Sequence, residues 1–163
     1  MKRAGFVCLA IFLGIALGAA AYAQPVVYVV RHGEKLDDSK DPPLSVAGEA
    51  RAARLERMLA ASGVKAIYTT QYQRTILHAA PVARALKIVP VVHPAADTPG
   101  LVKKIAAHSV DDVVLVVGHG NTVPEILKAL GYSIPIKIEE MEFDNLFVLV
   151  PGINAPVVVR LKY

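Results

Sequence analysis

Apolar, β-branched runs alternate with helical patterns along most of the chain. The run at 26–30, Val-Val-Tyr-Val-Val, has no polar face, which is typical of a strand covered on both sides in a parallel sheet. Further strands are predicted at 64–69, 88–92 and 113–117, and a terminal pair at 146–150 and 157–161 around Pro151-Gly152. The pattern therefore predicts one sheet that ends in a hairpin.

Helical patterns fill the spaces between these strands. Ser45 is the predicted N-cap of a helix that runs to about Ser62 and stops at Gly63. Thr98 is the predicted cap of a helix with Pro99 in its first turn and its end near His108. Two more helices are predicted at 71–86 and 122–130. We expect an α/β fold, a single-domain three-layer α/β/α sandwich with a mostly parallel, doubly wound sheet and an antiparallel C-terminal edge.

The first 23 residues differ from the rest. A basic start, Met-Lys-Arg, precedes an uncharged apolar run, and residues 21–23, Ala-Tyr-Ala, have the small-x-small form of a signal peptidase site. We predict a signal peptide at 1–23, cut after Ala23, and a domain at 24–163 that is periplasmic or secreted without a stable membrane anchor. An uncleaved anchor is the alternative, although the run is only weakly hydrophobic.

Charge and composition narrow the function classes. The chain has 18 Lys and Arg against 14 Asp and Glu, and removal of Lys2 and Arg3 with the signal lowers the formal charge from +4 to +2. The remaining charges are dispersed and tryptophan is absent, so nothing indicates a nucleic-acid partner. The single cysteine, Cys8, lies within the signal, so the mature domain would form no disulfide.

Three short sequences follow predicted strands at the end where open α/β sheets bind ligands. These are Arg-His-Gly-Glu at 31–34, Arg74 after the second strand, and Gly-His-Gly at 118–120. Phosphoryl transfer requires an in-line nucleophile and donors for the charge on the equatorial oxygens. Two arginines and two histidines supply both, because the planar guanidinium can bind two phosphate oxygens. Arg31 beside His32 also disfavours the imidazolium form.

These motifs resemble those of the histidine phosphatase superfamily (phosphoglycerate mutase-like), of which the chain looks like a short exported member. The family carries Arg-His-Gly after its first strand, a Ser/Thr-x-x-x-Arg-Thr/Ala stretch similar to 67–75, and a late Gly-His-Gly/Ala. Residues 41–48 are similar to its Pro-Leu-Ser/Thr-x-x-Gly helix entry. Two departures are His78, where members often have threonine, and Asp38, where mutase-like members often have asparagine.

The resemblance implies specific roles. His32 would become a phosphohistidine that water then hydrolyses, with no metal or other cofactor, and the phosphate would be held by Arg31, Arg74 and His119. Gly120 would let the backbone approach the anion, and Glu34 would support or orient Arg31 in the substrate site. Asp97 is the nearest candidate for the acid that protonates the leaving oxygen; the alternative is that it only caps or turns the chain before Thr98.

The leading hypothesis is a metal-independent, histidine acid-type phosphatase acting on a small exported or envelope phosphoester. A protein phosphohistidine phosphatase and a non-catalytic binder of phosphate or phosphosugars remain as alternatives. A zinc hydrolase is less favoured, because the five histidines show no tight ligand spacing. We expect structural roles for His78, His93 and His108, and a solvated acidic stretch at 139–144 unless it lines the pocket mouth. The sequence does not indicate an oligomeric state.

Overall fold

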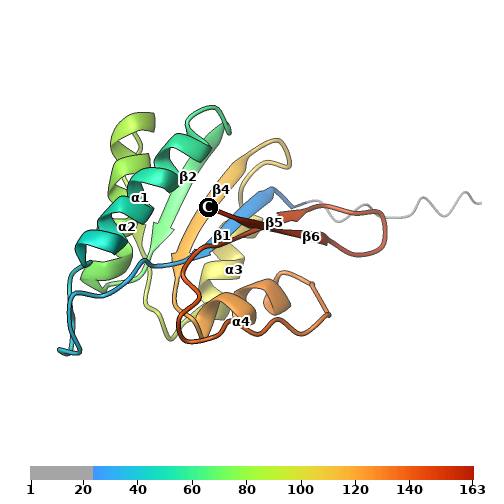
Figure 1. Cartoon of the computed structure of the whole chain (residues 1–163). Helices are drawn as coiled ribbons and strands as arrows, with labels where there is room; N and C mark the ends of the chain where they lie inside the picture. Colours follow the sequence, from blue (N-terminus) through green and yellow to red (C-terminus); the bar gives the residue numbers. More distant parts are fainter. Residues whose placement is uncertain (1–23) are drawn as a thin grey trace, which may run out of the picture.

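The computed structural model describes residues 24–163, so the predicted signal segment lies outside the described residues. Strands and helices alternate from the start of this region to the final hairpin (Figure 1). The strands are β1 (Val26–Arg31), β2 (Val64–Thr69), β3 (Val91–Val92), β4 (Val113–Gly118), β5 (Asn145–Val150) and β6 (Val157–Lys162). The helices are α1 (Val46–Leu59), α2 (Gln73–Leu86), α3 (Thr98–Ala106) and α4 (Thr122–Ala129).

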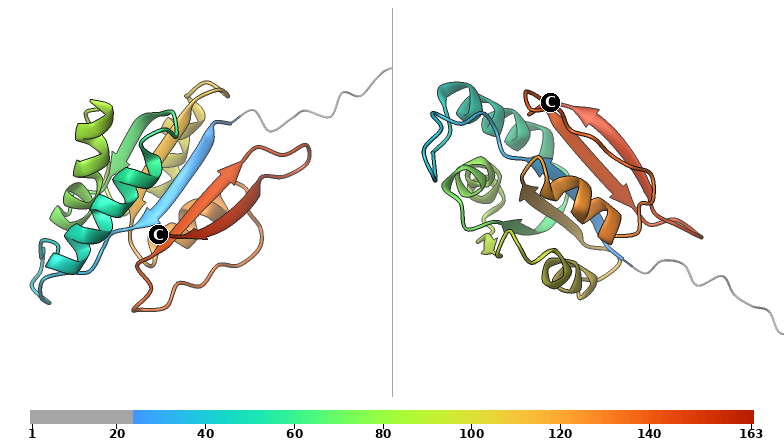
Figure 2. Two further views of the ribbon diagram at one scale, coloured as in Figure 1. Left: turned by 45° about the horizontal axis from the view of Figure 1, so that its top comes forward. Right: turned by 90° about the horizontal axis from the view of Figure 1, so that it is seen from below.

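One six-stranded sheet organises the domain, in the order β3-β2-β4-β1-β5-β6. Strands β1, β2, β3 and β4 are parallel, whereas β5 pairs antiparallel with both β1 and β6. Helices α1 and α2 lie on one face and α3 and α4 on the other (Figure 2). The predicted three-layer, doubly wound fold with an antiparallel edge is therefore confirmed.

Each face of the sheet has its own core. On one face Leu55 of α1 and Val82 of α2 pack against Leu115 and Val117 of β4. On the other face the apolar sides of α3 and α4 pack against alternate residues of the same strands, among them Val27, Val29, Val114 and Val116. The central strands are thus buried on both faces, which explains their continuous apolar sequences.

Three predicted boundaries need correction. The cap of α3 is Asp97, whose carboxylate accepts the Gly100 N–H at 2.9 Å, and Thr98 is already helical. Strand β3 is only Val91–Val92 because Lys87, at φ 57°, and Ile88 form the left-handed end of α2. Helix α2 begins at Gln73 because the two preceding residues form a turn after β2.

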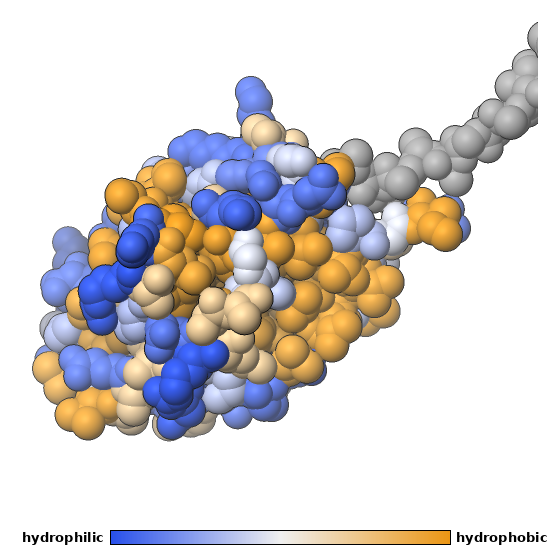
Figure 3. All heavy atoms as spheres, turned by 90° about the horizontal axis from the view of Figure 1, so that it is seen from above, coloured by the Kyte–Doolittle hydropathy of each residue, from blue (hydrophilic) through white to orange (hydrophobic). Residues whose placement is uncertain are grey.

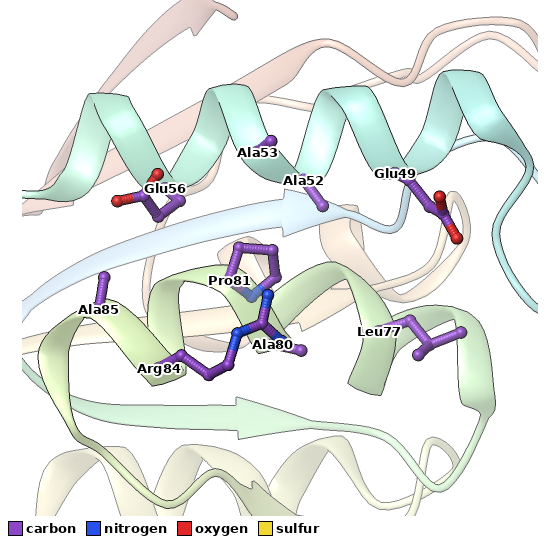
Figure 4. Close-up of a pocket in the computed structure, with 9 residues that line it drawn as sticks. All are labelled: Glu49, Ala52, Ala53, Glu56, Leu77, Ala80, Pro81, Arg84 and Ala85. Atoms are coloured by element: carbon purple, nitrogen blue, oxygen red, sulfur yellow. The ribbon is translucent and has the colours of Figure 1, made fainter.

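Helices α1 and α2 lie side by side over a groove of about 680 Å³ (Figure 4). Small side chains, Ala52 and Ala53 from α1 and Ala80 and Pro81 from α2, line its floor, and Glu49, Glu56, Leu77, Arg84 and Ala85 complete its walls. None of the predicted site residues lines this groove.

The surface of the domain is mixed. Apolar side chains gather on the face seen in Figure 3, next to charged ones. The edge strand β6 exposes Val157, Val159 and Leu161. Among residues 24–163, no helix has the length and apolar character needed to cross a membrane.

Gly48 gives a direct test of the packing of α1 against the loop after β1. A Cβ at Gly48 would overlap the Glu34 carbonyl oxygen and lie 3.0 Å from the Glu34 nitrogen. We expect Gly48→Ala to destabilise the protein by about 1–3 kcal/mol in urea unfolding, as overpacking does. Helix propensity alone would instead stabilise by about 1 kcal/mol. Ala50→Gly, at an exposed position of α1, is the control, because it measures the effect of helix propensity alone. A Gly48→Ala variant that is more stable than the wild type would contradict the account.

Candidate active site

The site forms where the carboxyl ends of β1 and β4 lie next to each other. Arg31 pairs with Gly118 in the ladder, and the His32 N–H donates to the Gly118 carbonyl at 3.0 Å. After these strands the chain turns to opposite faces of the sheet, into α1 and α4 (Figure 2). This divergence leaves a crevice, and ligands of doubly wound folds bind at such a point. The rings of His32 and His119 face it, with their centroids 5.3 Å apart.

An open cavity of about 540 Å³ occupies this crevice. The structure brings together in its wall five of the seven site residues predicted from the sequence: Arg31, His32, Arg74, His119 and Gly120. Other lining residues were not predicted from the sequence; they are Lys35, Tyr72, Ala95, Ala96, Asn121 and Thr122. The wall contains three permanent cations and no carboxylate, so the cavity suits an anion.

Both arginines of the cavity wall carry an unsatisfied donor. The Nε atoms of Arg31 and Arg74 are buried and have no hydrogen-bond partner within residues 24–163. A buried donor without a partner costs free energy, about 1–3 kcal/mol and more for a charged group. Two such donors beside one cavity indicate a ligand that accepts hydrogen bonds and carries negative charge.

The remainder of the Arg31 side chain is held by the segment before β5. Its Nη1 donates to the carbonyls of Glu139, Glu140 and Glu142 at 3.0, 2.7 and 3.2 Å. Its guanidinium lies 4.1 Å from the centre of the Phe143 ring. The backbone of this acidic stretch therefore holds Arg31, while Glu139 and Glu140 are exposed, as predicted for a solvated segment, and Glu142 and Asp144 form ion pairs with Arg160 and Lys162.

Arg74 lies in the first turn of α2 and is fixed by two weaker contacts. Its guanidinium lies 4.4 Å from the centre of the Tyr72 ring, and its Nη1 is 3.6 Å from the Asp41 carboxylate. Tyr72 also makes an edge contact with His119, at 5.4 Å between ring centroids. One aromatic ring thus orients two groups of the cavity wall.

His32 is held in one tautomer. Its Nδ1 lies 2.7 Å from the Gly33 carbonyl, which can only accept, so Nδ1 carries the proton and Nε2 keeps its lone pair. The pKa of His32 is lowered to about 3; burial is the largest cause, the hydrogen bond to Gly33 opposes it, and His119, Arg74 and Arg31 act in the same direction as burial. Repulsion by Arg31 thus acts in the predicted direction, but burial is the larger cause. A neutral imidazole with a free Nε2 is a competent nucleophile at neutral pH.

His119 is also buried and neutral. Burial lowers its pKa to about 4, and Arg74 and Arg31 contribute in the same direction. The Thr70 hydroxyl lies 3.0 Å from His119 Nε2, and the backbone N–H of His119 donates to the Thr122 hydroxyl at 2.9 Å. These contacts join the ends of β2 and β4 to the start of α4.

Two predicted site residues lie elsewhere. The Asp97 carboxylate caps α3 and lies 3.3 Å from His93 Nε2, and Asp97 is not part of the cavity wall. Glu34 forms an ion pair with Arg51 of α1, not with Arg31, and its oxygens accept from Arg51 Nε at 3.0 and 3.2 Å. Both carboxylates thus stabilise the scaffold around the site.

The three remaining histidines make structural contacts. His93 Nε2 donates to the Asp97 carbonyl at 2.7 Å, and His108 lies between the Tyr68 hydroxyl and Asp112. His78 is fully buried and contacts Gly33. Its departure from the family's threonine was the one signal in the sequence that marked it as unusual. Within 24–163 no cluster of His, Cys, Asp or Glu is arranged to hold a metal ion.

The fold around this crevice is that of the histidine phosphatases. Residues 27–97 match the model of the histidine phosphatase superfamily (branch 1), a segment that contains Arg31, His32 and Arg74. No curated protein gives a significant match to the chain.

Solved structures with this fold cover most of the chain at low identity. The protein histidine phosphatase SixA, complexed with tungstate, is 15% identical with a TM-score of 0.61, over 84% of this chain and 96% of that one. A mycobacterial glucosyl-3-phosphoglycerate phosphatase is 14% identical with a TM-score of 0.66, over 85% and 98%. A phosphoserine phosphatase mutant from Entamoeba histolytica is 11% identical with a TM-score of 0.65, over 83% and 95%.

The buried histidines predict a loss of stability in acid. His32 and His78, with pKa values of about 3, and His119, at about 4, stay neutral in the folded protein, whereas the unfolded chain takes up protons below about pH 6.5. Stability is therefore complete above about pH 6.5 and falls as the pH drops toward 4. Each such histidine contributes up to about 1.4 kcal/mol per pH unit.

Urea unfolding between pH 7.5 and 4.5 measures this slope. We expect His78→Gln, which cannot take up the proton, to reduce the slope by about one histidine's share. His108→Gln, at a histidine with much less burial, is the matched control. An unchanged slope in His78→Gln would show that this histidine is not held neutral.

Proposed function

We propose that the protein is a phosphomonoester hydrolase of the histidine phosphatase superfamily that acts through a phosphohistidine on His32. The observation that carries this proposal is the pair of buried, unpartnered guanidinium Nε atoms beside a histidine whose Nε2 lone pair is free. The family match at 27–97 supports the same conclusion. The cavity wall holds a nucleophile and phosphate ligands in one place.

In the first step Nε2 of His32 attacks phosphorus in line with the ester oxygen. The P–N bond forms as the P–O bond breaks, and the leaving oxygen takes a proton from solvent water. Arg31 and Arg74 neutralise charge on the equatorial oxygens, with His119 and the N-terminal end of α4 beside them. The Gly33 carbonyl stabilises the cation that forms on the ring, because it accepts the Nδ1 proton.

In the second step water attacks the phosphohistidine. The P–N bond breaks and inorganic phosphate leaves with one oxygen from water, while the electron pair returns to Nε2. The water loses a proton to the phosphate or to solvent, and His32 regains its neutral form. These steps use side chains of the cavity wall, the Gly33 carbonyl, the N-terminal end of α4 and water, and we propose that they need no metal.

A second candidate function is hydrolysis of protein phosphohistidine, and the composition of the cavity wall favours it. None of the residues that line the cavity is Asp or Glu, so no carboxylic acid stands ready to protonate a poor leaving group. The nitrogen of a phosphohistidine leaves more readily than an alkoxide. The neighbour SixA is named as a protein histidine phosphatase, and the wide opening of the cavity is compatible with a side chain on another protein.

The natural location remains a proposal from the sequence. We propose that the enzyme acts outside the cytoplasm after removal of residues 1–23, on a phosphorylated compound of the envelope or the medium. Mass spectrometry of the exported protein should give Gln24 as its first residue, and an intact Met1 in the membrane fraction would favour the anchor instead.

Turnover of an aryl phosphate in the presence of EDTA tests the leading proposal. We expect the wild type to release phosphate and His32→Ala to lose at least about 1000-fold in kcat, because the covalent route is gone. His93→Ala, at a buried histidine outside the cavity, is the matched control and should keep its activity. Phosphate binding without turnover in the wild type would favour the non-catalytic binder, and loss of turnover in EDTA would exclude the metal-free mechanism.

Because no carboxylate lines the cavity, we predict a preference for substrates with a good leaving group. We expect kcat/KM for phosphoramidate and for an aryl phosphate to exceed that for an alkyl phosphate by about 100-fold or more, because the alkoxide needs a proton. Asp97→Asn should leave the aryl-to-alkyl ratio unchanged. If Asp97 is the acid after all, this variant will lower the alkyl rate far more than the aryl rate.

A further inference from the structure

A chain of hydrogen bonds links Tyr163 to the loop that carries His32. The Tyr163 hydroxyl lies 2.9 Å from His78 Nε2, and the Gly33 N–H donates to His78 Nδ1 at 3.1 Å. Gly33 in turn accepts the Nδ1 proton of His32. His78 is fully buried, so these contacts are made without competition from water.

The direction of both hydrogen bonds of His78 is determined. Because the backbone N–H of Gly33 can only donate, Nδ1 of His78 is unprotonated, and the ring proton must be on Nε2, which donates to Tyr163. Burial keeps this ring neutral by lowering its pKa to about 3, and the Arg51 guanidinium adds to the effect. The opposite tautomer of His78 would place two donors against each other at Gly33.

Tyr163 is itself fixed at both ends of its backbone. Its N–H donates to the Asp144 carbonyl at 3.0 Å, and its backbone oxygen accepts from Arg51 Nη1 at 3.2 Å. The residue directly follows β6, and its ring packs against the core beneath α1 and α2. The hydroxyl therefore reaches His78 from a rigid position.

Gly33 lies in a closely packed position next to His78. A Cβ at Gly33 would lie 2.9 Å from Gly48 Cα and 3.1 Å from His78 Nδ1, so a side chain would not fit there without a shift of its neighbours. Gly33 therefore contacts His78 through its N–H and holds the His32 ring by its carbonyl.

We propose that His78 and Tyr163 are positioning residues that act through Gly33 to hold His32 in the tautomer with a free Nε2. The role rests on the proposed function, since it matters only if His32 is the nucleophile. Neither residue touches the substrate cavity, so their contribution falls on the reacting geometry and not on phosphate affinity.

Tyr163→Phe removes the hydroxyl and keeps the ring. We expect kcat for an aryl phosphate to fall by about 5- to 20-fold, as expected for a lost buried hydrogen bond, with KM within about twofold of wild type. Tyr132→Phe, at a partly buried tyrosine on the other face of the sheet, is the matched control and should be unchanged. A rise in KM with no change in kcat would contradict a positioning role.

A double-mutant cycle separates positioning from packing. His78→Gln can accept from Gly33 and donate to Tyr163, so it should retain most of the kcat, whereas His78→Leu can do neither. If Tyr163 acts through His78, Tyr163→Phe will have no further effect in the His78→Leu background. Multiplicative losses in the double variant would show that the Tyr163 hydroxyl acts independently of His78, and would overturn the proposal.

The ¹⁵N shifts of the His32 ring give a readout that does not depend on turnover. Wild type should show protonated Nδ1 and unprotonated Nε2, and Tyr163→Phe and His78→Leu should show a mixture of tautomers. Identical shifts in all three would refute the proposal even if the enzyme is active. A wild type with the expected shifts but no turnover of any phosphate would instead reject the proposed function and leave the hydrogen-bond chain established.

Discussion

The parallel pairing of β1 with β4 is the constraint on which the remaining structure depends. It sets Arg31 beside Gly118 in the ladder, so that two histidines distant in sequence follow at the same edge of the sheet. The chain then continues into α1 and α4 on opposite faces of the sheet (Figure 2), and both imidazole rings line the cavity at this point. Since both strands are buried on both faces, the position of the crevice is fixed by the core and not by the loops that border it.

Burial acts differently on the arginines and on the histidines of the site. The arginines keep their charge despite the burial that lowers the pKa of Arg31, because guanidinium does not lose its proton in proteins. The histidines, by contrast, become neutral when water is removed. Fixed cations and uncharged imidazoles thus line the same cavity, and in the proposed function His32 would use its uncharged ring to attack the phosphoryl group.

Much of the fold could be predicted from the sequence because the buried strands leave continuous apolar runs, as at Val26–Arg31. The cluster of Arg31, His32, Arg74 and His119 was predictable for a related reason, since each lies at or shortly after the carboxyl end of a parallel strand. Boundaries decided by one side chain were less predictable. Asp97 and Thr98 can both cap a helix, and only the Gly100 N–H contact shows which one does.

Contacts between distant segments could not be predicted. The carbonyls that hold Arg31 lie more than 100 residues later in the chain, and carbonyls leave no mark on the sequence. The partnership of Glu34 with Arg51 rather than Arg31 depends on how α1 packs. His78 and Tyr163 meet only because the last strand returns to the sheet beside α1.

The central claim is that Nε2 of His32 accepts the phosphoryl group, and rapid-quench mass spectrometry tests it most directly. The wild type mixed with an aryl phosphate and quenched in base should carry one phosphoryl group on the peptide containing His32, stable to base and lost in acid, as a phosphoramidate is. A phosphate found on another residue, or turnover without any labelled protein under conditions where breakdown is slowed, would contradict the account.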